Sequence, residues 1–142
     1  MTGTQPARRP RARRGEPPGR TLVVCVDDEP HILAALARLL REEPYEVRTT
    51  TDPEEALSWV RTGEVSVLVA DYRMPGMSGT TLLQLAKAFS PRTRRIMLTG
   101  YPGETLLISA GEIGLMDLVG KPWDDEALKE LIRDRLAWSD PE

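Results

Sequence analysis

The 142-residue sequence has little cysteine and little histidine, the residues on which many catalytic and metal sites depend. Its single cysteine, Cys25, has no partner for a disulfide within the chain, and we expect it to be a small buried residue in a reducing compartment. The single histidine, His31, cannot build a zinc cluster or a serine-type triad alone, and we expect it to be exposed in the first turn of a helix. These shortages exclude zinc centres and histidine-based nucleophilic catalysis.

Long apolar segments are absent as well. No apolar run approaches the length of a membrane span, and the N-terminus lacks the apolar core of a secretory signal. With 40% hydrophobic residues and a net charge of −3, the chain is long enough for one domain with a full core. We therefore expect one soluble cytoplasmic domain, not bound to a membrane.

Residues 1–20 differ in composition from the rest of the chain. They hold six arginines against one glutamate, a net charge of about +5, and four prolines interrupt any regular period. We interpret this segment as a disordered basic tail and favour a dispensable extension. Binding to nucleic acid or to an acidic partner, and mitochondrial targeting, are the alternatives.

From Thr21 onward, apolar strand-like segments alternate with amphipathic helical ones. The predicted strands are 21–26, 45–51, 65–70, 94–100 and 115–119. A helix is predicted after each strand, although the fourth, around 103–111, is weakly specified because glycines surround it. Strict alternation of this kind predicts an α/β domain with one parallel sheet, covered on both faces and connected by right-handed crossovers.

Local signals mark where several helices begin and which face they bury. Asp52 is a predicted N-cap and Glu55 a capping-box acid for the second helix, and Asp124 is a predicted N-cap for the last one. The third helix has a predicted apolar stripe, made of Leu82, Leu85, Ala86 and Phe89.

Polar residues end four of the predicted strands. Because the carboxyl ends of parallel strands meet at one edge of a sheet, we expect these side chains to lie close together. They are Asp27, Asp28, Asp71, Thr99 and Lys121. Taken alone, Asp71 would be interpreted more simply as a cap for the next helix, and the group as a whole could be an ion-pair network.

The residue types in this group suit phosphoryl transfer. Three neighbouring carboxylates repel one another, and Mg²⁺ would relieve that repulsion while keeping coordination places for water and phosphate. Lys121 can pair with Asp71 or with a phosphoryl oxygen, and Thr99 offers a hydroxyl donor. An ionised carboxylate is already a nucleophile, so no general base is needed.

Four motifs carry a family resemblance: VDDEP at 26–30, DYRMPGMSG at 71–79, LTGY at 98–101 and GLMDLVGKPW at 114–123. On these motifs, residues 21–138 resemble the receiver domain of bacterial two-component response regulators, leaving 1–20 and 139–142 as tails. The resemblance implies a flavodoxin-like, doubly wound sheet of five parallel strands in the order 2-1-3-4-5, with five helices.

The same resemblance implies a role for each site residue. Asp71 is the expected phosphoacceptor, and Asp27, Asp28, Asp71 and the backbone carbonyl of Arg73 are the expected Mg²⁺ ligands. Thr99 is the expected switch hydroxyl and Lys121 the phosphate-binding lysine. The peptide between Lys121 and Pro122 is expected to be cis.

The expected activity is that of a signalling domain, not of an enzyme beyond self-catalysed phosphorylation and dephosphorylation. A histidine kinase or phosphotransfer protein would donate the phosphoryl group, approaching near His31, Ala34 and Pro122. Only four residues follow the last predicted helix, so we expect a stand-alone, chemotaxis-regulator-like domain without a DNA-binding domain. Such a domain would signal by contact with a protein target, and a homodimer is left open.

Two features of the sequence bear on how this domain would respond. Many family members have Tyr or Phe three residues before the lysine, where this chain has Leu118. Any switch must then work through Thr99, the loop after it and the glycine-rich fourth helix; the alternative is a small conformational response. In the receivers that this chain resembles, the residues two after the phosphoacceptor and two after the switch hydroxyl flank the path of water to the phosphorylated aspartate. Here they are Arg73 and Tyr101, and as a lid they would slow hydrolysis. The alternative is that both side chains extend into solvent.

Two other functions are kept as alternatives. A haloacid-dehalogenase-like phosphohydrolase would have its nucleophile at Asp27 and would need a further acidic pair where this chain has Thr99, Gly100 and Tyr101. A pseudo-receiver adaptor would bind a partner without phosphate, which the complete set of pocket residues does not favour.

Overall fold

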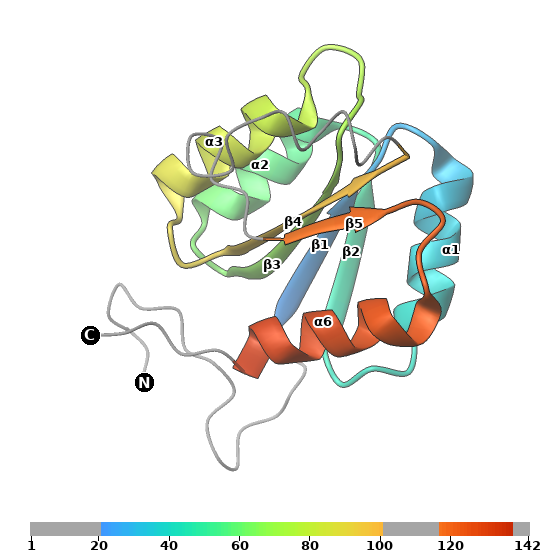
Figure 1. Ribbon diagram of the computed structural model, residues 1–142. Coiled ribbons are helices and arrows are strands. Elements are labelled where there is room, and N and C mark those ends of the chain that lie inside the picture. The colour runs from blue at the N-terminus through green and yellow to red at the C-terminus, as the bar shows by residue number, and fades with distance from the viewer. Residues whose placement is uncertain (1–20, 101–116, 138–142) are drawn as a thin grey trace.

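The computed structural model describes residues 21–100 and 117–137, in which strands and helices alternate (Figure 1). The elements are β1 (Leu22–Val26), α1 (Pro30–Leu40), β2 (Glu46–Thr50), α2 (Pro53–Arg61), β3 (Val65–Asp71), α3 (Gly79–Phe89), β4 (Arg94–Thr99), β5 (Asp117–Gly120) and α6 (Asp125–Ala137). The strands form one parallel sheet in the order β2-β1-β3-β4-β5, which confirms the predicted fold. Four helices lie within the described residues, and the fifth predicted helix, around 103–111, lies outside them.

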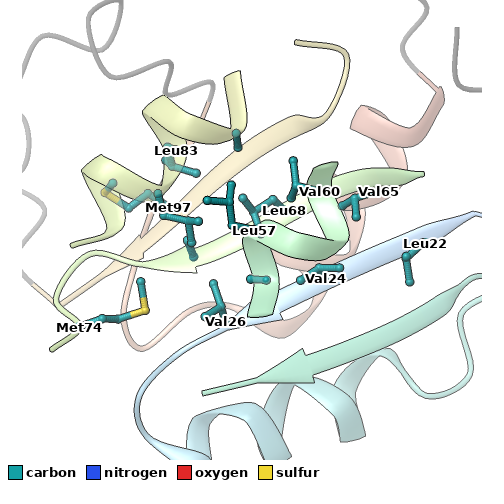
Figure 2. Packing of buried hydrophobic residues seen from close by; sticks show 14 residues of the cluster. Leu22, Val24, Val26, Leu57, Val60, Val65, Leu68, Met74, Leu83 and Met97 are labelled. Carbon is teal, nitrogen blue, oxygen red and sulfur yellow. The ribbon is translucent and has the colours of Figure 1, made fainter. Parts of the chain in front are cut away.

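Two apolar layers cover the sheet because successive strand residues point to opposite faces. In β1, Leu22, Val24 and Val26 join the cluster under α2 and α3, which Figure 2 shows from close by. Val23 and Cys25 join the second cluster, under α1 and α6. Every residue of β1 is buried, as expected for a strand covered on both faces.

The helix starts follow most of the predicted local signals. Asp52 Oδ1 accepts the N–H of Glu54 at 2.9 Å, and Asp124 Oδ1 accepts the N–H of Ala127 at 2.9 Å, so both predicted N-caps are confirmed. The predicted capping box, in which Glu55 would bond the Asp52 N–H, is wrong. Glu55 accepts a hydrogen bond from the Thr50 hydroxyl at 2.6 Å, and the Asp52 N–H donates to that same hydroxyl at 3.0 Å. Thr50 is the last residue of β2. Its hydroxyl lies between the Asp52 N–H and the Glu55 carboxylate, the two groups that a capping box would join directly.

The predicted apolar stripe of α3 is correct except at its end. Phe89 is 46% exposed, whereas Leu83, which the stripe omitted, is completely buried. The helix packs against both the sheet and α2, so its buried face is wider than one stripe. The Phe89 ring lies 4.3 Å from the Arg61 guanidinium carbon, a contact that partly shields it from water.

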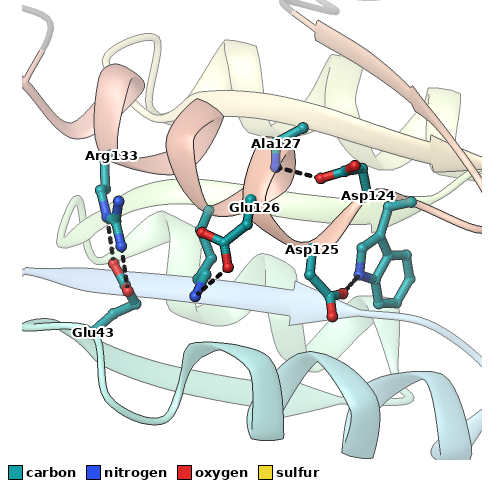
Figure 3. Close-up of polar contacts among 8 residues, drawn as sticks. Glu43, Asp124, Asp125, Glu126, Ala127 and Arg133 are labelled. Atoms are coloured by element: carbon teal, nitrogen blue, oxygen red, sulfur yellow. Dashed lines mark hydrogen bonds and ion pairs between the residues drawn. The ribbon is translucent and has the colours of Figure 1, made fainter.

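Ion pairs attach α6 to the rest of the domain, and Figure 3 shows the one between Arg133 and Glu43. The guanidinium of Arg133 donates two hydrogen bonds of 2.8 Å to Glu43, in the segment between α1 and β2. Arg135 donates two more, of 2.7 and 2.8 Å, to Asp117 in β5. These contacts fix α6 relative to the strand that precedes Lys121.

Within the described ranges, no helix is both long enough and apolar enough to span a bilayer.

Candidate functional site

The strand ends bring the predicted polar residues to one edge of the sheet. Asp27 and Asp28 directly follow β1, Asp71 is the last residue of β3, Thr99 is the last residue of β4, and Lys121 directly follows β5. Asp71 pairs with Leu98 in the sheet, and Thr99 pairs with Gly120. The backbone N–H of Lys121 also donates to the carbonyl of Thr99 at 2.7 Å, which fixes the lysine beside β4.

Lys121 is hydrogen bonded to two carboxylates. Its ammonium nitrogen lies 2.7 Å from Asp71 Oδ1, the pairing predicted from the sequence, and 2.9 Å from Asp27 Oδ2, which the sequence did not predict. Asp27 is almost completely buried, Asp71 is 7% exposed and Thr99 is 1% exposed. The charged groups of Asp27, Asp71 and Lys121 therefore interact largely out of contact with water.

Burial and neighbouring charge shift the pKa values in this group. Burial raises the pKa of Asp71; the hydrogen bond from Lys121 opposes that rise, and the charges of Asp27 and Asp28 add to it. Burial lowers the pKa of Lys121, but its hydrogen bonds to Asp71 and Asp27 outweigh this effect, and its pKa is raised overall. The site thus holds a lysine that stays protonated next to carboxylates that repel one another.

The three aspartates fit a hard divalent cation. Asp27, Asp28 and Asp71 each offer a carboxylate oxygen, and these oxygens lie within 4.8 Å of one another. Oxygen donors with several negative charges are the ligands that Mg²⁺ takes in proteins. Asp28 is exposed and Asp27 is buried, so a cation can reach the group from solvent at Asp28 and be bound on its inner side by Asp27.

An open cleft of about 470 Å³ is lined by Asp28, the exposed member of the three aspartates. Its lining comes from the loop after β1, the loop after β3 and the start of α3, and includes Asp28, Tyr72, Arg73, Met74, Pro75, Ser78 and Thr80. The guanidinium carbon of Arg73 lies 5.8 Å from the centre of the Tyr72 ring. Tyr101, the other half of the predicted lid, lies outside the described residues, so the lid stays a prediction.

The loop after Asp71 requires glycine at two positions, for two different physical reasons. Gly76 has a φ of +85°, a conformation that glycine adopts without strain. Gly79 does not have a positive φ; a Cβ there would overlap the carbonyl oxygen of Asp71. Ser78 caps α3 by accepting the N–H of Thr81 at 3.2 Å, so the simpler interpretation of Asp71 as the helix cap is wrong.

Several predictions around the site are confirmed. The peptide between Lys121 and Pro122 is cis. His31 is exposed in the first turn of α1, as predicted. Ala34 and Pro122 are exposed as well, and the approach of a phosphodonor near these three residues stays a prediction. Cys25 is completely buried, and burial together with the charge of Asp27 raises the pKa of its thiol to about 12, so it is not poised to react. Leu118 packs against the cluster under α2 and α3.

The sequence placed Glu55 in a capping box but did not indicate its contact with Thr50 or the contact of Thr50 with Asp27. The carbonyl of Thr50 accepts the N–H of Asp27 at 3.3 Å, and the Thr50 hydroxyl bonds Glu55. No local signal indicates the relation of these residues to Asp27, because it depends on the register that pairs Val26 with Thr50.

Comparison with known proteins agrees with this geometry. Residues 23–133 match the response regulator receiver domain family. The receiver domain of an HD domain-containing protein from Pseudomonas fluorescens is 34% identical, with a TM-score of 0.76 over 83% of this chain and 88% of that one. A CheY-like receiver domain from Methanospirillum hungatei is 28% identical, with a TM-score of 0.75 over 82% of this chain and 93% of that one.

Two of the curated relatives are longer proteins named as transcriptional regulatory proteins. The hydrogenase transcriptional regulatory protein HoxA of Cupriavidus necator is 34% identical over 78% of this chain, which corresponds to 23% of HoxA. FixJ of Rhizobium meliloti is 31% identical over 78% of this chain and 54% of its own length. The haloacid-dehalogenase-like and pseudo-receiver alternatives are not favoured by these matches. With its parallel sheet, its carboxylate group and these similarities, the chain belongs to the response regulator receiver domain family.

Proposed function

We propose that this receiver domain accepts a phosphoryl group on Asp71 from the phosphohistidine of a histidine kinase or phosphotransfer protein. The observation that carries the proposal is the position of Asp71. Its carboxylate ends a buried strand, lies 2.7 Å from the Lys121 ammonium and belongs to a group of three aspartates beside an open cleft. A nucleophile therefore lies beside a compensating cation, and another carboxylate of the same group, that of Asp28, lines the open cleft.

In the transfer step, an Asp71 carboxylate oxygen forms a bond to phosphorus while the phosphorus–nitrogen bond of phosphohistidine breaks. The electron pair of the broken bond stays on the imidazole nitrogen, which leaves neutral because the other ring nitrogen carries a proton. Asp71 needs no base, since it reacts as the carboxylate. Lys121 turns from the Asp71 oxygen to a phosphoryl oxygen, and the Thr99 hydroxyl donates to another.

Mg²⁺ would be held by Asp27, Asp28, Asp71 and the backbone carbonyl of Arg73. When bound, it neutralises the charge on the transferred oxygens. Asp27 keeps capacity for this role, because its two carboxylate oxygens each accept one hydrogen bond, from the Glu29 N–H and from Lys121, and a carboxylate has about four lone-pair sites.

The signal would leave the domain by contact with another protein in the cytoplasm. His31 and Ala34 on α1 and Pro122 after β5 are exposed, and we assign them to the surface that the phosphodonor approaches. Turnover on a substrate is not part of the proposal, beyond self-catalysed gain and loss of phosphate.

The test is incubation with acetyl phosphate and Mg²⁺, followed by intact mass measurement. Wild-type protein is expected to gain one phosphoryl group, and Asp71→Asn is expected to gain none. Asp124→Asn, which changes an exposed carboxylate at the start of α6, is the matched control and should be labelled like wild type. A gain that survives in Asp71→Asn, or that is undiminished in EDTA, would contradict the proposal.

A further inference from the structure

Asp27 is held by its backbone as well as by its side chain. Its N–H donates to the carbonyl of Thr50 at 3.3 Å, just beyond the pairing of Val26 with Thr50 that ends the β1–β2 ladder. This hydrogen bond is long and lies at the end of a ladder, where strands fray most easily. The position of Asp27 therefore depends on how firmly the end of β2 is fixed.

A second set of hydrogen bonds fixes the end of β2. The Thr50 hydroxyl donates to Glu55 Oε1 at 2.6 Å and accepts the N–H of Asp52 at 3.0 Å. Thr50 is 7% exposed, so its hydroxyl has few opportunities to bond water instead. We call this the Thr50–Glu55 clamp. It attaches the last residue of β2 to the first turn of α2, which in turn packs on the sheet.

We propose that the Thr50–Glu55 clamp positions Asp27 for cation binding, so that Thr50 and Glu55 are positioning residues of the phosphoacceptor site. Neither residue touches the transferred group. The clamp acts through the Thr50 carbonyl, which orients the Asp27 backbone and with it a carboxylate that already bonds Lys121 and the Glu29 N–H. The part of this inference that concerns Mg²⁺ rests on the proposed function.

Partners that orient a metal ligand matter nearly as much as the ligand itself. Their loss typically weakens metal binding about 10- to 100-fold. Here the partner holds the ligand's backbone, so we expect an effect near the lower end of that range. Breaking the clamp should also expose the Asp27 N–H to solvent more often, whether or not Mg²⁺ is present.

Two substitutions break the clamp and two conservative ones keep it. Thr50→Val removes the hydroxyl but keeps a β-branched residue suited to a strand, and Glu55→Ala removes an exposed carboxylate. Thr50→Ser and Glu55→Gln preserve a donor and an acceptor. Ser58→Ala is the matched control, because it removes another hydroxyl hydrogen bond on the exposed side of α2, the one from Ser58 to the Glu55 carbonyl.

The measurements are amide hydrogen exchange on metal-free protein and calorimetric titration with Mg²⁺ alone. In Thr50→Val and Glu55→Ala, the Asp27 amide should exchange about 10-fold faster than in wild type, with the Val24 amide unchanged, and the Mg²⁺ dissociation constant should rise about 10-fold. Thr50→Ser, Glu55→Gln and Ser58→Ala should behave like wild type.

Unchanged Asp27 exchange in both clamp-breaking variants would overturn the proposal. Equal acceleration at Asp27 and Val24 would also overturn it, because that pattern indicates general destabilisation. Faster exchange with unchanged Mg²⁺ affinity would overturn the positioning role. Failure of the wild-type protein to bind Mg²⁺ would instead contradict the proposed function, and the Asp27 amide would still decide whether the clamp holds the backbone.

Discussion

Gly79 lies against the backbone carbonyl of Asp71, so close that a Cβ on Gly79 would overlap the carbonyl oxygen. The same Cβ would lie 3.0 Å from the Cα of Tyr72. The N–H of Gly79 uses this proximity by donating to the carbonyl of Tyr72 at 3.0 Å. The start of α3 is thereby attached directly to the strand end that carries the phosphoacceptor.

Gly79→Ala should therefore displace Asp71 as well as destabilise the fold. The methyl group would overlap backbone atoms, which cannot move away by a rotamer change as a side chain can. We therefore expect a cost of about 1–3 kcal/mol in the free energy of unfolding. Urea unfolding and labelling by acetyl phosphate measure the two effects. Gly100→Ala is the control, because a Cβ there meets nothing within 4 Å. Equal stability and equal labelling of the two variants would show that the loop accommodates the methyl group.

Lys121→Ala should impair transfer while leaving Mg²⁺ binding largely intact. The variant loses the cation that compensates Asp71 and Asp27, and removal of one such group typically slows a reaction about 100-fold. Mg²⁺ should raise the melting temperature of the variant more than that of wild type, because without Lys121 the bound Mg²⁺ is the cation that compensates the carboxylates. Labelling rates and thermal scans with and without Mg²⁺ measure both effects.

The comparison for Lys121 is Lys129→Ala, which removes a lysine paired only with the exposed Glu126 at 3.1 Å among the contacts described. Asp28→Ala should differ from Lys121→Ala because it weakens Mg²⁺ binding itself. We expect its Mg²⁺ affinity to fall by more than about tenfold, because a direct ligand is lost. Similar Mg²⁺ affinities for Asp28→Ala and wild type would remove Asp28 from the ligand set.

The contact between Glu43 and Arg133 should make stability depend on pH. The hydrogen bonds from Arg133 hold the pKa of Glu43 below its ordinary value of 4.5, against a smaller opposing effect of burial, and the charges of Arg133 and Lys129 add to the lowering. The stabilisation is thus fully present above about pH 4.5 and is lost as the pH falls through the lowered pKa of the folded state.

The measurement for this contact is the difference in melting temperature between wild type and Glu43→Gln. The difference should be largest near neutral pH and should disappear in acid. Glu126→Gln serves for comparison, because the Glu126 side chain is 75% exposed and its ion pair should contribute little. A difference that stays constant down to pH 3 would show that Glu43 acts through packing and not through charge.

Deletion of residues 1–20 should leave the stability of the domain unchanged. The deleted segment has few large apolar residues and a net charge of about +5, so the free energy of unfolding should change by less than about 0.5 kcal/mol. A large fall in melting temperature would contradict the interpretation of this segment as a dispensable tail. If the segment binds nucleic acid instead, affinity should fall steeply as salt is added.

Tyr101→Ala, and to a lesser degree Arg73→Ala, should shorten the lifetime of the phosphorylated protein. A lid formed by the two side chains would exclude the water that attacks the acyl phosphate, so its loss should speed hydrolysis without slowing phosphorylation. The phosphorylated fraction is followed over time after the donor is removed. Unchanged lifetimes in both variants would indicate that these residues serve a partner surface instead.

The sequence predicted the strand ends and the polar group because both depend on local patterns. Val65–Asp71 is an apolar run that ends in a carboxylate, and parallel topology then determines which strand ends meet. The N-caps at Asp52 and Asp124 were predictable for the same reason, because the capping residue and the N–H groups it bonds are close in sequence.

What the sequence could not predict depends on register and packing. The second hydrogen bond of Lys121, to Asp27, joins residues 94 positions apart. The partner of Glu55 is Thr50 because β2 ends beside the first turn of α2, and the exposure of Phe89 depends on how α3 lies against α2. None of these contacts leaves a periodic trace in the sequence.

One of the two edge strands, β2, also has a consequence for solubility. Edge strands present unpaired backbone groups to which another chain can add. On β2, Arg48 bonds Glu46 at 3.0 Å and lies over the Trp59 ring at 5.5 Å, so charged groups line this edge and the indole beside it is covered. A second chain would have to strip water from that ion pair before pairing with β2, which disfavours growth of the sheet into aggregates.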